Sequence, residues 1–315
     1  MKILFFERNH GNSYSYYNEI RNALGRMNTV YQFGKWSPIG GPEIHINDVL
    51  SLCPQKPDII LFGFGWTDCS ENYPKQVKGL DACKIPVAVI LNKEYAALDK
   101  KLDWIKKMKP EVAFCVHHDY DEYSKVTGVP FYQIPFAVNP KIFKKYDNEE
   151  YDCDFGFSGV IRPEQTEDWR AKIVEKSSQW SDIEFSFSQH RHDSLESYAR
   201  RLNRSRAWLS TTGPADLVGT RYYEVMALGT TLLVCNRFDR VYDGLFEENK
   251  HCVMFSSIEE LEEKIKYYLK NPTEMKTIID NAMKHTLENH TWDHRAEKIT
   301  KILKDVAFET KTGEL

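Results

Sequence analysis

Short apolar runs alternate with longer amphipathic stretches along this chain. In the first half, the apolar runs cover residues 2–6, 58–65, 85–91 and 112–116. A continuous apolar run of this length, bounded by polar turns, is typical of a strand covered on both faces of a parallel sheet. Residues 14–26, between the first two runs, have the spacing of a helix instead. The pattern predicts alternating strands and helices, which is the α/β class.

The pattern restarts after a polar stretch at residues 144–152. It predicts strands at residues 153–159, 183–187, 207–211 and 231–235, and helices at 163–179, 194–204, 221–228 and 258–269. We therefore expect two Rossmann-like domains facing a cleft, over residues 1–145 and 146–292. Residues 293–315 are expected to form a helix that packs back on the first domain. In such sheets, ligands bind beyond the carboxyl ends of the strands.

Composition narrows the class of protein. The 315 residues carry a net charge of −4 and no basic stripe, which argues against nucleic-acid binding. Seven cysteines, an odd number without a CxxC pair, favour a reduced, cytoplasmic compartment and argue against a cysteine metal site. The first residues are too short a run for a signal peptide, and no apolar run could span a bilayer. Peripheral membrane contact and oligomeric state stay open.

The stretch at residues 213–235 carries the most specific chemistry. A loop beginning at Gly213 precedes the predicted helix at 221–228, and an apolar strand follows at once. Arg221 and the free backbone N–H groups of the first helical turn form a natural seat for an anion such as a diphosphate. One turn further on, the Glu224 carboxylate can accept hydrogen bonds from sugar or ribose hydroxyls. The segment therefore predicts a nucleotide-sugar site.

Three segments resemble group 1 glycosyltransferases with the GT-B fold. Residues 222–233, YYEVMALGTTLL, resemble the signature (F/Y)-E-A-M-A-x-G-x-P-(L/V) of that group. Residues 290–296, HTWDHRA, resemble its H-T-(Y/W)-x-x-R element, and residues 157–162 resemble the strand-to-loop entry of its donor domain. The chain is most similar to the CgeB-like branch, in which an arginine stands a few residues before the helix glutamate, as Arg221 does here.

The resemblance assigns roles at the donor end. It implies that Glu224 binds the ribose hydroxyls and that Asp216 contacts the donor sugar, although the family has glutamate at this first position. Arg162 and Arg221 would flank the diphosphate, for which the planar guanidinium is well suited. Stabilising the leaving group in this way needs no metal, and we find no Asp-x-Asp motif of the metal-dependent kind. The expected donor-binding residues also include Ser158, Gly159, Gly213, Thr220 and Tyr222.

The acceptor end is less defined. His10, Gly11 and Asn12 follow the first predicted strand and are expected to bind the acceptor, in a loop loosely similar to the family's glycine-rich acceptor loop. Glu94 and His117, with its neighbour His118, end the third and fourth predicted strands. These side chains could orient or deprotonate an acceptor hydroxyl, which makes them catalytic candidates together with Asp216.

Together these features predict a glycosyltransferase that moves a hexosyl or pentosyl group from a nucleoside-diphosphate sugar, such as a UDP- or GDP-sugar, to an acceptor hydroxyl. The resemblance implies retention of configuration, independence of metal and no further cofactor. A carbohydrate, a lipid-linked molecule and a protein all stay open as acceptors. Two alternatives remain: a nucleotide-sugar epimerase of the same fold, and a non-catalytic nucleotide-sugar-binding or structural protein.

Overall fold

The chain folds into two compact units. A computed structural model describes residues 1–7, 16–34, 44–68, 76–147, 149–161, 169–189, 194–212, 216–238 and 240–312. Unit 1 consists of Met1–Pro135 and Trp292–Leu315, and unit 2 consists of Phe136–Thr291. The boundary precedes the expected one by ten residues, because Val138 and Phe143 are buried in the apolar core of unit 2.

Unit 1 is built on a six-stranded parallel sheet with the strand order β2-β1-β4-β6-β7-β8. These strands are β1 (Lys2–Phe6), β2 (Thr29–Phe33), β4 (Ile59–Phe62), β6 (Val87–Ile90), β7 (Val112–Cys115) and β8 (Phe131–Gln133). A two-stranded ladder pairs β3 (Ile44–His45) with β5 (Val77–Lys78). The helices are α1 (Tyr16–Met27), α2 (Ile46–Ser51), α3 (Leu98–Met108), α4 (Tyr120–Thr127) and α10 (Trp292–Thr312).

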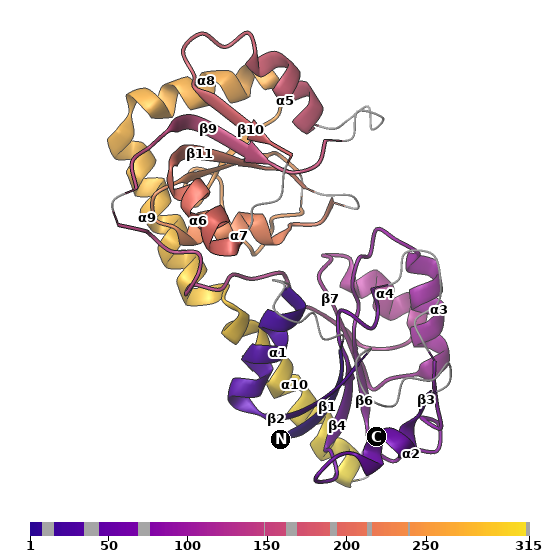
Figure 1. The fold of residues 1–315 in the computed structure, drawn as a ribbon. Helices are drawn as coiled ribbons and strands as arrows, with labels where there is room; N and C mark the ends of the chain where they lie inside the picture. Colours follow the sequence, from indigo (N-terminus) through magenta and orange to yellow (C-terminus); the bar gives the residue numbers. More distant parts are fainter. Residues whose placement is uncertain are drawn as a thin grey trace. The chain divides into compact units, whose positions relative to one another are not determined.

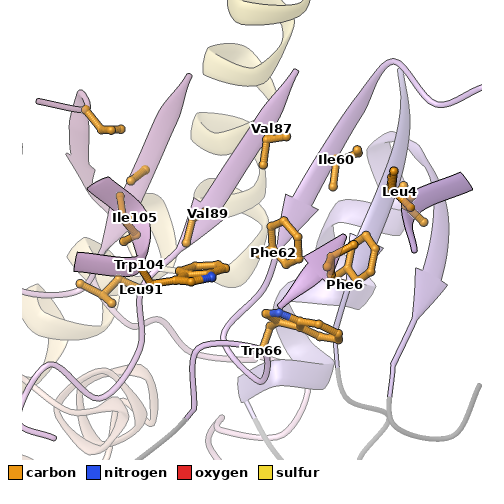
Figure 2. Close-up of a cluster of buried hydrophobic side chains, with 14 of the residues drawn as sticks. Leu4, Phe6, Ile60, Phe62, Trp66, Val87, Val89, Leu91, Trp104 and Ile105 are labelled. Atoms are coloured by element: carbon orange, nitrogen blue, oxygen red, sulfur yellow. The ribbon is translucent and has the colours of Figure 1, made fainter. Parts of the chain in front are cut away.

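The sheet of unit 1 is covered on both faces. Alternate side chains of its central strands meet α3 on one face (Figure 2). There the rings of Phe62 and Trp104 pack edge to face, with their centres 5.6 Å apart. Helices α1 and α10 lie on the other face (Figure 1). Because both faces are buried, polar groups are confined to the ends of the strands, as the continuous apolar runs predict.

Helix α10 is part of unit 1, although it ends the chain. It packs along α1, where Asn28 donates a hydrogen bond to the hydroxyl of Thr300 at 2.8 Å. Arg295 donates to the carbonyl of Pro135 at 2.7 Å, and Lys298 donates to the carbonyl of Gln133 at 2.9 Å. These bonds join the last helix to the segment that follows β8.

Unit 2 is built on a five-stranded parallel sheet with the strand order β10-β9-β11-β12-β13. Its strands are β9 (Cys153–Ser158), β10 (Phe185–Ser188), β11 (Ser205–Ser210), β12 (Leu232–Asn236) and β13 (Val253–Phe255). Its helices are α5 (Trp169–Ser177), α6 (Leu195–Asn203), α7 (Thr220–Ala227), α8 (Ile258–Lys270) and α9 (Pro272–Asn289). Residues of α6 and α7 share one buried cluster with the sheet, and residues of α5 and α8 share a second.

Two local details bear on the sequence-based predictions. Strand β4 ends at Phe62 rather than at residue 65, since a turn begins at Gly63, whose carbonyl accepts a hydrogen bond from the N–H of Trp66. Within the described ranges, no helix is long and apolar enough to cross a membrane. The six cysteines in these ranges are all free thiols.

The packing of β9 gives a testable prediction. Gly156 lies opposite Trp208 of β11, and a Cβ atom at position 156 would come within 2.2 Å of the indole ring. We expect Gly156→Ala to destabilise the protein by about 1–3 kcal/mol, because the buried indole cannot move without strain. The matched variant Gly25→Ala, on the exposed side of α1 with open space around it, should instead stabilise by about 0.5–1 kcal/mol.

Denaturant unfolding of both variants measures these changes. Equal effects of the two substitutions would contradict the assigned contact between Gly156 and Trp208.

Candidate functional site

The sheet of unit 2 has a topological switch point between β9 and β11. The chain passes from β9 to β10 on one side of β9 and then returns to β11 on the other side. Ligands of open α/β sheets bind beyond the carboxyl ends of the strands at such a point. Ser158 and Gly159 end β9, and Thr211 follows β11 at the same edge. Two of the residues predicted to bind the donor therefore lie at the switch point.

Arg221 lies at this edge and is held there by an unpredicted residue. Its Nε donates a hydrogen bond to the hydroxyl of Tyr198 at 2.9 Å, and the side chain of Ser158 is hydrogen-bonded to the same hydroxyl. A Cβ atom at Gly159 would lie 3.4 Å from Nη1 of Arg221, so the guanidinium rests close against the backbone after β9. Burial lowers the pKa of Arg221, but Tyr198 and Glu224 outweigh this effect, and the pKa lies above its usual value. The side chain stays cationic.

Glu224 lies one helical turn beyond the start of α7 and is only 4% exposed. Burial raises the pKa of its carboxyl from 4.5 to about 7, although the charge of Arg221 and a hydrogen bond with Thr220 act in the opposite direction. A buried carboxyl poised near neutrality next to a cation is typical of a functional site rather than of a surface helix.

The amino end of α7 has no side-chain cap. Gly219 occupies the N-cap position without a capping hydrogen bond, so the first-turn N–H groups are not satisfied by a cap side chain. Asp216, in the loop before the helix, has a left-handed backbone with φ of 55° and is partly exposed. Aspartate tolerates this conformation better than most residues. Thr220, Arg221 and Glu224 thus lie in the first turns of a helix without a side-chain cap, with Asp216 in the adjoining loop.

One other predicted donor residue, Tyr222, is not brought to this cluster. The ring of Tyr222 is buried in the core of unit 2, where it stacks on Phe246 and its hydroxyl bonds that of Tyr242 at 3.1 Å. Its side chain therefore points away from Arg221 and Glu224. Arg162 and Gly213 lie outside the described residues.

Arg170 is a second cation at the same edge that sequence reasoning missed. Its Nε donates to the hydroxyl of Thr211 at 2.8 Å, and its Nη1 donates to the carbonyl of Val160 at 3.3 Å. The guanidinium also lies over the ring of Phe157, 5.4 Å from its centre. No local motif marks Arg170, because only the packing of α5 against the sheet brings it to the end of β9.

Unit 1 has its own switch point, between β1 and β4. The loop after β1, with His10, Gly11 and Asn12, lies outside the described residues. Along the same edge, the Oε1 atom of Glu94 accepts hydrogen bonds from the N–H groups of Val116 and His117, at 2.8 and 3.2 Å.

Burial raises the pKa of the Glu94 carboxyl, and its Oε2 has no hydrogen-bond partner among the described residues. The fully buried Lys101 donates to the carbonyls of Asn92 and Lys93 and thereby fixes the turn that leads to Glu94.

Two histidines lie in the turn after β7. The Nδ1 atom of His117 accepts a hydrogen bond from the N–H of Asp119 at 3.0 Å, and its side chain is 9% exposed. His118 is 27% exposed, and its Nε2 lies 3.5 Å from a carboxylate oxygen of Asp119. His118 is therefore the more exposed of the two imidazole rings. Ligand atoms of His117, His118 and Asp119 also lie within 4.8 Å of one another, close enough to hold a metal ion.

Contrary to expectation, the sequence contains two Asp-x-Asp runs, of which one, Asp119 and Asp121, follows β7, and the second lies in unit 2. The second run consists of Asp152 and Asp154, which flank Cys153 at the amino end of β9. Asp152 pairs with Arg201 at 2.5 Å, and Asp154 pairs with Arg206 at 3.4 Å. The second run therefore lies at the edge of the sheet opposite the donor cluster, and its charges are matched by arginines.

Comparisons with solved structures identify relatives over nearly the whole chain. HepE of Anabaena, solved with UDP and glucose, is similar over 97% of this chain and 100% of its own, with 12% identity and a TM-score of 0.64. Sucrose-phosphate synthase from Thermosynechococcus elongatus is similar over 97% and 98%, with 11% identity and a TM-score of 0.65. No curated protein sequence matches this one.

At such identities the likeness establishes the fold, and it confirms the prediction of two Rossmann-like domains of the GT-B type. The sequence itself matches the model of a family described as glycosyl transferase-like over residues 143–301, just over half of the chain. The match spans β9 to β13 and the α7 motif with Arg221 and Glu224. The protein thus belongs to the glycosyl transferase-like family, as its group 1 motifs predict.

Proposed function

We propose that this protein transfers a hexosyl or pentosyl group from a nucleoside-diphosphate sugar to an acceptor hydroxyl. The observation that carries the proposal is the cluster of Arg221 and Glu224 at the switch point of unit 2: a fixed cation for a diphosphate beside a buried carboxyl for ribose hydroxyls. The structure of HepE with UDP and UDP-glucose supports a uridine donor as the first to test. The position of Arg221 before Glu224 supports membership of the CgeB-like branch.

In the proposed reaction, the acceptor oxygen bonds to the anomeric carbon as the bond between that carbon and the diphosphate breaks. The acceptor proton passes to a base, and the nucleoside diphosphate leaves with one more negative charge. Arg221 and Arg162 stabilise this developing charge more strongly than the charge of the bound donor, which is the requirement for catalysis. Their fixed cations supply what a metal would otherwise supply at the diphosphate, so we propose that transfer is metal-independent.

The remaining roles complete the proposal. Asp216 contacts the donor sugar, and His10, Gly11 and Asn12 bind the acceptor. At the acceptor end, His117 and Glu94 orient the acceptor hydroxyl. His118 takes the proton because its ring is the more exposed. The resemblance of residues 222–233 to group 1 enzymes supports retention of the anomeric configuration.

Turnover of a donor panel tests the proposed activity. With UDP-, GDP- and dTDP-sugars, we expect release of the nucleoside diphosphate from one donor class, at a slow rate while water is the acceptor. Glu224→Ala should lower kcat/KM about a hundredfold, since hydrogen bonds to a charged acceptor each contribute roughly 1.5–3 kcal/mol. Interconversion of a UDP-sugar without release would instead indicate an epimerase, and binding without either reaction a non-catalytic protein.

The pKa of Glu224 predicts a pH dependence of donor binding. The folded-state pKa is raised to about 7, so the carboxylate that accepts ribose hydroxyls is fully formed only above that pH. We expect the affinity for UDP-glucose, whose diphosphate does not titrate near neutrality, to rise about tenfold from about pH 6 to about pH 8. Glu224→Gln should abolish this slope. A slope that persists in Glu224→Gln would assign the dependence to another group.

Treatment with EDTA tests metal independence. We expect donor turnover to be unchanged after chelation and dialysis, because the charge of the leaving diphosphate is matched by arginines. Loss of activity that Mg²⁺ or Mn²⁺ restores would refute this mechanism. Asp119→Asn tests the cluster of His117, His118 and Asp119, because a metal required there would make activity depend on the Asp119 carboxylate.

A further inference from the structure

Tyr198 holds the guanidinium of Arg221, and its own ring has little freedom. It lies on α6, whose amino end is capped by Ser194, and is 9% exposed. Its ring makes edge contacts with Phe143 and Trp208, at 6.0 and 6.5 Å between ring centres. The hydroxyl therefore occupies a defined position at the end of β9, where it accepts a hydrogen bond from Arg221 and is also hydrogen-bonded to Ser158.

The tether itself adds no negative charge beside Arg221, on which Glu224 acts only from beyond ion-pair distance. In the described part of the chain, no carboxylate lies within ion-pair distance of this guanidinium, whereas Arg200, Arg201 and Arg206 of the same unit each pair with an acid. Burial raises the pKa of Tyr198, so its hydroxyl stays neutral. A carboxylate in its place would fix the arginine equally well but would cancel the charge that an anion needs.

The geometry also directs the free end of Arg221. Nε is the atom that Tyr198 holds, and Nη1 lies against Gly159, which has a φ of 144° that few other residues adopt. A tether at Nε leaves the Nη donors for a ligand at the end of β9. Because the planar guanidinium holds its five N–H groups in one rigid fork, fixing Nε fixes the direction of the others.

We propose that Tyr198 is a positioning residue for the diphosphate of the donor, a neutral partner that orients Arg221 without neutralising it. This inference rests on the proposed function, since it names how the same site holds its charged ligand. An acid in an ion pair would both orient Arg221 and neutralise its charge, whereas Tyr198 only orients it. The arginine is thereby fixed before the ligand arrives, which reduces the ordering cost of binding.

A double-mutant cycle tests the role of Tyr198. Affinities for UDP and uridine, and for GDP and guanosine, are measured by calorimetry for the wild type, Tyr198→Phe, Arg221→Gln and the double variant. We expect Tyr198→Phe to weaken binding of the diphosphate about tenfold and binding of the nucleoside by less than about twofold, because the lost bond acts only through Arg221. In the Arg221→Gln background, Tyr198→Phe should have no further effect.

Tyr268→Phe serves as the matched control. It removes another buried hydroxyl of unit 2, bonded to Asn249 at 3.5 Å, and should leave both affinities unchanged. Equal weakening of diphosphate and nucleoside by Tyr198→Phe, or additive effects in the double variant, would overturn the positioning role while leaving the proposed function intact. Failure of the wild type to bind any nucleoside diphosphate would overturn both.

Discussion

The burial of both faces of both sheets is the constraint on which the rest of this structure depends. The central strands β4, β6, β7 and β12 are buried at every position, so neither side of these sheets can carry a polar cluster. Parallel strands also require crossover connections, which place helices over both faces and bring loops together at the ends of the strands. Chemistry is therefore confined to one edge of each sheet, and both candidate clusters lie there.

At the carboxyl edge of the sheet of unit 2, charged side chains are partnered in an unusual way for a protein interior. Most arginines of unit 2 that are in contact with other elements pair with acids, and such pairs contribute little beyond local order. Arg221 contacts a phenol instead, and the nearby Glu224 is buried enough that its pKa lies near neutrality. The charged forms of Arg221 and Glu224 are therefore less stabilised than they would be in a close ion pair. An anionic ligand carrying hydroxyls would complement both of them, which is why the cluster supports a nucleotide-sugar donor.

The sequence predicted most of the longer strands and missed several that are short or exposed. β1, β4, β6, β7 and β12 each coincide with an apolar run. The edge strand β2 has the sequence TVYQF and is largely exposed, and β13 is only three residues long, so neither carries a run that stands out. The boundary between the units was placed ten residues late, because Lys144 to Asp152 is polar while the buried Phe143 before it already belongs to unit 2.

The sequence by itself determined the elements and the local chemistry of α7. Arg221 and Glu224 lie three residues apart, and the spacing of a helix is sufficient to place them on neighbouring turns. Their partners were decided only by the tertiary structure. Tyr198 is separated from Arg221 by 23 residues, and Arg170 from Thr211 by 41. Both contacts depend on the register of β9 with β11 and on how α5 and α6 pack against them. A hydrogen bond requires ångström precision, and hydrophobic patterning does not supply it over such separations.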